Sequence, residues 1–187
     1  MSTLREFLQQ KRAALLLRRE WVHRTPDAAL VTISASATAE GRSGIRRIRI
    51  RDFQIVSDSP ASFAGYDLGA TSPELLLGAL SSCLTHTYLI QAADLRIPLD
   101  DVRVDVSGQI DSRAGTPGFE DALIYPHEIR YIATVVTEIE DLSHLNSAVE
   151  RFCPILNLLR RGNEVVGEIL RVPPSERGAN LAQAANR

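Results

Sequence analysis

The sequence lacks several features that mark large classes of protein. Its 187 residues include two cysteines, one tryptophan and one methionine, and only 5% of the residues are aromatic. Basic and acidic residues nearly balance, at 21 and 23, so the formal net charge is -2. That balance predicts no broad electrostatic attraction to nucleic acid or to an anionic membrane.

Targeting signals and familiar motifs are missing as well. No apolar run approaches the roughly 18–20 residues needed to cross a bilayer. The N-terminal apolar run, residues 13–17, is too short for a secretory signal, and Glu6 and Glu20 argue against a transit peptide. No GxxxxGKS/T, GxGxxG, HExxH or GxSxG motif occurs, so nucleotide, zinc-protease and α/β-hydrolase readings lack support. We expect a cytoplasmic protein.

The hydrophobic pattern that is present predicts an α+β fold, because paired strands run together instead of alternating strictly with helices. Thr3 and Glu6 form a possible capping box at the start of the first helix. The expected helices span residues 2–22, 72–93, 142–152 and 155–161, and the expected strands span residues 30–38, 45–57, 101–111, 127–138 and 164–172. The first two strands are predicted to form a hairpin.

Three segments follow from this pattern. Residues 1–24 are interpreted as a helical appendage, and residues 29–172 as the main domain. Residues 173–187 are polar and rich in alanine, which predicts a disordered tail.

Cys83 lies in the middle of the predicted helix 72–93, for which Ser72 is the expected N-cap and Pro73 the first helical residue. The helix is apolar around most of its circumference, which is typical of a buried central helix. Burial alone would raise the pKa of a cysteine, and the dipole effect fades within the first helical turn. A reactive Cys83 therefore needs a cation, for which Arg42, on a glycine-flanked turn, is one candidate among many arginines.

Cys153 directly precedes Pro154, so it is the expected N-cap of a short helix. Exposed backbone N–H groups and the positive end of the helix dipole would lower its pKa. The alternative at this point is a structural thiol at a helix break.

His86 follows Cys83 by three residues and therefore shares its helix face. It is a candidate to activate the thiol or to join Cys83 and Cys153 in a metal site, with His127 or Asp67 as a fourth ligand. The spacing matches no compact zinc pattern, so a packed, hydrogen-bonded histidine is favoured over a metal ligand.

The segment from Ser72 to Cys83, SPELLLGALSSC, followed downstream by Phe152-Cys153-Pro154, resembles the OsmC/Ohr family. The Gly41–Gly44 turn is similar to the family's arginine-bearing turn, and the resemblance covers residues 29–172. It implies an OsmC-like fold, in which an antiparallel sheet packs on a long central helix, with residues 1–24 added. It also implies an intertwined homodimer with active sites at the subunit interface.

The same resemblance implies a cofactor-free thiol peroxidase that acts on organic hydroperoxides and is restored by an external dithiol. Cys83 would be the peroxidatic thiol, Cys153 the resolving thiol that forms a disulfide with it, and Arg42 the thiolate activator. Glu74 matches the glutamate that holds this arginine, although it sits one residue closer to the cysteine than in the best-studied peroxidases. A favourable first-turn acid is the alternative interpretation of Glu74.

Three other functions remain open from the residues alone. The protein could be a non-catalytic thiol sensor or sulfur carrier, a metal-binding module built on Cys83, His86 and Cys153, or a structural domain with two inert cysteines. Turnover with a dithiol, elemental analysis and the rate of thiol alkylation distinguish these alternatives.

Overall fold

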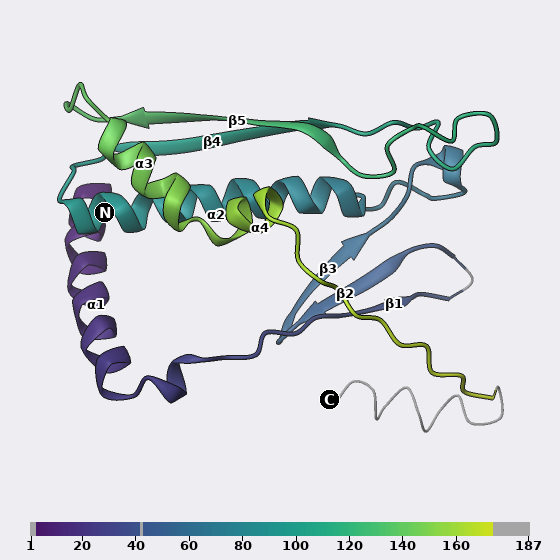
Figure 1. The fold of residues 1–187 in the computed structure, drawn as a ribbon, viewed down its shortest axis with the longest axis horizontal. Helices are drawn as coiled ribbons and strands as arrows, with labels where there is room; N and C mark the ends of the chain where they lie inside the picture. Colours follow the sequence, from purple (N-terminus) through teal and green to yellow (C-terminus); the bar gives the residue numbers. More distant parts are fainter. Residues whose placement is uncertain (1–2, 42, 174–187) are drawn as a thin grey trace. The chain divides into compact units, whose positions relative to one another are not determined.

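The computed structural model describes residues 3–41 and 43–173, which divide into two compact units (Figure 1). The first unit comprises the described residues up to Thr32 together with Ala70–Arg161. The second comprises Ile33–Gly69 and the segment that starts at Gly162. The predicted boundaries at residues 24, 29 and 172 stay predictions, and the predicted tail lies outside the described residues except for Pro173.

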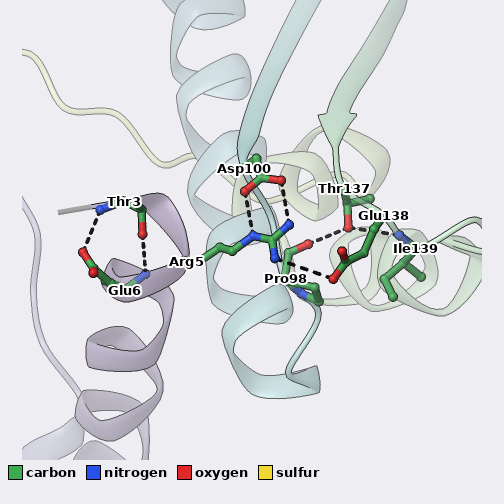
Figure 2. Close-up of polar contacts among 8 residues, drawn as sticks. All are labelled: Thr3, Arg5, Glu6, Pro98, Asp100, Thr137, Glu138 and Ile139. Atoms are coloured by element: carbon green, nitrogen blue, oxygen red, sulfur yellow. Dashed lines mark hydrogen bonds and ion pairs between the residues drawn. The ribbon is translucent and has the colours of Figure 1, made fainter. Parts of the chain in front are cut away.

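The first helix, α1 (Leu4–Arg24), begins at the capping box that the sequence predicted. The Thr3 N–H donates to Glu6 Oε2 at 2.8 Å, and the Glu6 N–H donates to Thr3 Oγ1 at 3.3 Å. Figure 2 shows how Arg5, in the same first turn, is attached to the rest of the unit. Arg5 donates to both carboxylate oxygens of Asp100, at 2.6 and 2.8 Å, and its Nη1 lies 3.6 Å from Glu138. Helix α1 is therefore held by ion pairs to Asp100 and Glu138.

The long helix α2 (Ser72–Leu95) organises the first unit. Its N-cap is Thr71 and not Ser72 as predicted, because Glu74 sits three residues after Thr71 and completes a capping box with it. Its buried apolar residues form much of the core: Leu80, Leu84, Tyr88, Ala92 and Ala93.

By length and composition alone, α2 is also a candidate membrane span, with 28% of the relevant window buried. Ser, Thr and Gln interrupt the apolar residues of this helix, so it meets the criteria by its mean hydropathy and not by an unbroken apolar run. The central helix of a globular domain meets the same criteria, and α2 packs on α1, β4, α3 and α4.

A two-stranded antiparallel sheet lies along α2 (Figure 1), formed by β4 (Asp101–Gln109) and β5 (His127–Val136). Side chains on one face of these strands pack on the core, among them Val102, Val104, Val106, Ile129 and Tyr131. The chain then forms α3 (Ser143–Phe152) and α4 (Pro154–Arg160), which both contact α2. This packing places the break between α3 and α4 beside the middle of α2.

The second unit contains a three-stranded antiparallel sheet of β1 (Ser36–Ala39), β2 (Arg46–Ile50) and β3 (Phe53–Ser57). The predicted hairpin is confirmed, since β1 pairs with β2. The predicted single strand 45–57 is wrong: it is two strands joined at Arg51 and Asp52, with Arg51 at φ 54°. No glycine marks this turn, which is why the sequence concealed it.

The predicted strand 164–172 is also wrong, because no strand is formed there in the described single chain. Its apolar side chains find no packing: Val165 is 91% exposed, Val166 85% and Ile169 95%. The pattern of the segment is that of a strand, but a strand requires a partner edge to satisfy its backbone groups.

Candidate active site

The two cysteines lie side by side although 70 residues separate them in sequence. Cys83 Sγ on α2 and Cys153 Sγ at the α3–α4 break are 3.4 Å apart, and both are free thiols. Cys153 is fully buried, whereas Cys83 is partly exposed. A sulfur–sulfur bond is about 2.05 Å long, so a shift of about 1.4 Å would bring these atoms to bonding distance.

The surroundings of Cys83 act on its thiol in opposite directions. Burial raises the pKa of Cys83, and the neighbouring Cys153 raises it further. The backbone N–H of Ile155 and, least of all, the Thr87 side chain act in the opposite direction on this pKa. The Thr87 hydroxyl itself donates to the Cys83 backbone carbonyl at 2.7 Å. Burial is the largest of these effects, so Cys83 needs a further positive charge to be a thiolate at neutral pH.

Cys153 occupies the predicted position, as the N-cap of α4 with Pro154 the first helical residue. The N-terminal turn of α4 points a donor at the other cysteine, however, because the Ile155 N–H interacts with Cys83. The positive end of this short helix therefore serves Cys83 as well, an arrangement that the Cys-Pro step alone does not reveal.

Glu74 is exposed and engaged at the start of α2. Its Oε2 accepts from the Thr71 N–H at 2.7 Å and from the Thr71 hydroxyl at 2.8 Å. These hydrogen bonds, the backbone bond first, lower the pKa of Glu74. Both bonds use one oxygen, so Oε1 can still accept from an arginine.

His86 contacts helix α1. Lys11 Nζ lies 3.1 Å from His86 Nε2, and burial followed by the charge of Lys11 lowers the pKa of His86. Among residues 3–41 and 43–173, no group of three or more His, Cys, Asp or Glu side chains is arranged to hold a metal ion. The structure therefore gives His86 a hydrogen-bonding partner, Lys11.

Arg42 lies outside the described residues, but the turn that carries it is attached within the second unit. Arg46 donates to the Gly44 carbonyl at 2.8 Å and, with its other terminal nitrogen, to the Asp58 carbonyl at 2.8 Å. Asp58 is fully buried and accepts from the backbone N–H groups of Tyr66 and Leu68 at 2.9 and 3.2 Å. These bonds connect the Gly41–Gly44 turn with the loop that leads to α2.

Sequence reasoning missed the donors around the thiols. Asn157 Nδ2 donates to the carbonyls of Glu150, Arg151 and Cys153, at 2.9, 3.2 and 2.8 Å. The available signal was the proline, because Pro154 lacks an N–H and leaves a carbonyl of the preceding helix without its usual donor.

Comparisons with known proteins agree with this architecture. The family model described as OsmC-like protein matches residues 65–167. No match was found among curated protein sequences. Three solved structures share the fold at low sequence identity, and each spans most of its own length in the alignment.

The first, an OsmC-like protein from Mycoplasma pneumoniae, is 19% identical, with a TM-score of 0.59 over 70% of this chain and 88% of that one. The second, an OsmC-like protein of unknown function from Vibrio cholerae, is 15% identical, with a TM-score of 0.56 over 68% and 93%. The third, an organic hydroperoxide resistance protein from Elizabethkingia anophelis, is 22% identical, with a TM-score of 0.55 over 72% and 91%.

These findings define the fold as an α+β fold of the OsmC-like type, with a cysteine pair beside its central helix. The chain belongs to the OsmC family.

Proposed function

We propose that the protein is a cysteine-based peroxidase that reduces organic hydroperoxides. The observation that carries this proposal is the 3.4 Å separation of Cys83 Sγ and Cys153 Sγ at the helix break. It is supported by membership of the OsmC family and by similarity in fold to an organic hydroperoxide resistance protein. The reaction needs two thiols within reach of each other and no bound cofactor.

In the proposed cycle, the Cys83 thiolate attacks the terminal peroxide oxygen. The O–O bond breaks, Cys83 becomes a sulfenic acid, and the leaving alkoxide takes a proton to form an alcohol. The Cys153 sulfur then attacks the sulfenic sulfur of Cys83. The sulfur–sulfur bond forms, the S–OH bond breaks, and the hydroxide leaves as water with the proton of the Cys153 thiol. An external dithiol reduces the disulfide and completes the cycle.

We assign first attack to Cys83 because it is the partly exposed thiol, whereas Cys153 is fully buried. Arg42 is proposed to supply the positive charge that the buried surroundings of Cys83 require, since a guanidinium can contact a thiolate and a peroxide oxygen together. Glu74 is proposed to orient Arg42 through Oε1 while Oε2 remains bonded to Thr71.

The proposed assembly is an intertwined homodimer. Contiguous apolar side chains are exposed in two segments of the single chain: Leu30 and Ile33 are each 91% exposed, and Ile169 is 95% exposed. Apolar patches of this kind mark interaction sites. We propose that a second copy covers them. A reducing cytoplasm would supply the dithiol.

The test is turnover of cumene hydroperoxide by the reduced protein in the presence of dithiothreitol. We expect the wild type to consume peroxide repeatedly and to form an intramolecular disulfide. The Cys83→Ser variant should lose turnover, and Cys153→Ser should accumulate a sulfenic acid that dimedone traps. Unchanged thiol counts after peroxide would exclude this function.

A second candidate is a non-catalytic thiol sensor or sulfur carrier. The observation in its favour is the raised pKa of Cys83, since a mostly protonated thiol reacts slowly. A sensor would oxidise once and would not turn over with any dithiol reductant. Multiple turnovers per protein molecule would exclude this candidate.

A further inference from the structure

The helix break that carries Cys153 leaves carbonyls at the end of α3 without their normal donors, among them those of Glu150 and Arg151. In a continuous helix, the N–H of each residue bonds the carbonyl four residues earlier. The partner of the Glu150 carbonyl would be residue 154, which is a proline and has no N–H. The partner of the Arg151 carbonyl would be the N–H of Ile155, which is instead directed to Cys83.

One side chain replaces the donors that the Glu150 and Arg151 carbonyls lack. Asn157 Nδ2 donates to the Glu150 carbonyl at 2.9 Å and to the Arg151 carbonyl at 3.2 Å. The same nitrogen lies 2.8 Å from the Cys153 carbonyl, which also accepts from the Asn157 backbone N–H at 3.1 Å. Since an amide group has only two hydrogens, the three carbonyls share them.

Neighbouring contacts hold the two helices that Asn157 joins. The Glu150 side chain accepts from the Tyr131 hydroxyl of β5 at 3.0 Å and from Arg160 of α4 at 3.4 Å. Cys153 itself is fully buried between these contacts and α2.

We propose that Asn157 is a positioning residue, which holds the α3–α4 break in the form that presents Cys153 Sγ to Cys83. This inference rests on the proposed peroxidase function and adds to it the group that sets the geometry of the resolving step. Asn157 touches neither sulfur nor substrate in this assignment. It acts by satisfying carbonyls that would otherwise recruit the Ile155 N–H or open to water.

The experiment measures the two steps of oxidation separately in full-length protein. Cumene hydroperoxide is added to the reduced wild type and to Asn157→Asp and Asn157→Ala variants in the presence of dimedone. Mass spectrometry then gives the ratio of Cys83–dimedone adduct to Cys83–Cys153 disulfide. Asn157→Asp keeps the shape but removes the donor, and Asn157→Ala removes the donor without adding a charge.

We expect disulfide closure to be roughly tenfold slower in both variants, the size of loss expected when two backbone carbonyls lose their donors. The dimedone adduct should increase correspondingly, while thermal unfolding stays cooperative. Asn163→Asp, the same change at an exposed position, is the control and should behave as the wild type does.

Either Asn157 variant closing its disulfide within twofold of the wild-type rate would overturn the inference. If Asn157→Asp fails to fold, Asn157→Ala decides the question, and a folded Ala variant with normal closure counts against the proposal. A wild type that forms no sulfenic acid and no disulfide would instead refute the proposed peroxidase function, so the two failures are distinguishable.

Discussion

Cys83 Sγ and Cys153 Sγ lie 3.4 Å apart, and the helix that Cys153 caps directs the Ile155 N–H at Cys83. The Cys-Pro step thus places the second thiol and also supplies a donor to the first. Burial still raises the pKa of Cys83, so these local contacts alone do not explain a reactive thiol.

Removal of the proposed cation, Arg42, should lower the reactivity of the Cys83 thiol. In a Cys153→Ser background, we expect Arg42→Ala to slow alkylation of Cys83 by iodoacetamide at neutral pH by about tenfold or more, because the thiolate loses its charge partner. A time course of alkylation, quenched at intervals and analysed by mass spectrometry, measures this rate. Arg49→Ala in strand β2 is the matched control, and an equal effect of both changes would refute a specific role for Arg42.

Glu74 should matter to helix α2 whether or not it orients Arg42. Its hydrogen bonds with Thr71 lower its pKa, so its contribution to stability is present above the unfolded pKa and lost as pH falls through the lowered folded value. Glu74→Ala should therefore reduce the thermal unfolding temperature at pH 7 and have less effect at pH 3. A constant difference across this range would contradict the capping role.

Activity separates the two roles of Glu74. Glu74→Gln keeps an acceptor for Thr71 but removes the negative charge. If Glu74 orients Arg42, this variant should lose peroxide turnover by about tenfold while it retains most of its stability. Full activity of Glu74→Gln would leave only the capping role.

Lys11 should control the charge of His86. Burial and Lys11 both lower the pKa of His86, so the folded state binds fewer protons than the unfolded state below the ordinary pKa of about 6.5. The stability associated with neutral His86 is therefore fully present above pH 6.5 and is lost as the pH falls through the lowered folded pKa. Lys11→Gln should raise the pKa of His86, as followed by NMR titration of its ring protons. Lys11→Arg is the control, and an unchanged value in Lys11→Gln would contradict the contact.

Assembly should depend on the exposed segment near residue 169. We expect Ile169→Asp to convert a dimer to a monomer in light scattering, because a charge would replace an apolar side chain at the proposed interface. Glu168 is exposed and adjacent to Ile169, so Glu168→Gln is the control, and it should leave the dimer intact. A monomeric wild type would overturn the dimer proposal.

The sequence predicted features whose cause is local. The capping box of Thr3 and Glu6 and the N-cap position of Cys153 depend on a few adjacent residues, and both are confirmed. Prediction from the sequence failed where the structure depends on a turn without a typical residue or on pairing with a distant strand. The turn at Arg51 lacks glycine, and residues 164–172 have no neighbouring strand in the described chain.

The site shows the same division. Spacing could place Cys83 on a helix and Cys153 at a break, but not the 3.4 Å between their sulfurs, because that distance depends on the packing of α4 against α2. Asn157 was missed because its role exists only once the helix breaks at Pro154 and the Glu150 and Arg151 carbonyls lose their helical donors.

The most direct test of the central claim is mass spectrometry of the reduced protein after one equivalent of cumene hydroperoxide. The account predicts loss of two mass units in an intramolecular Cys83–Cys153 disulfide, no disulfide in Cys83→Ser, and a Cys83 sulfenic acid in Cys153→Ser. Wild-type protein that keeps both thiols free while the peroxide remains unconsumed would contradict it.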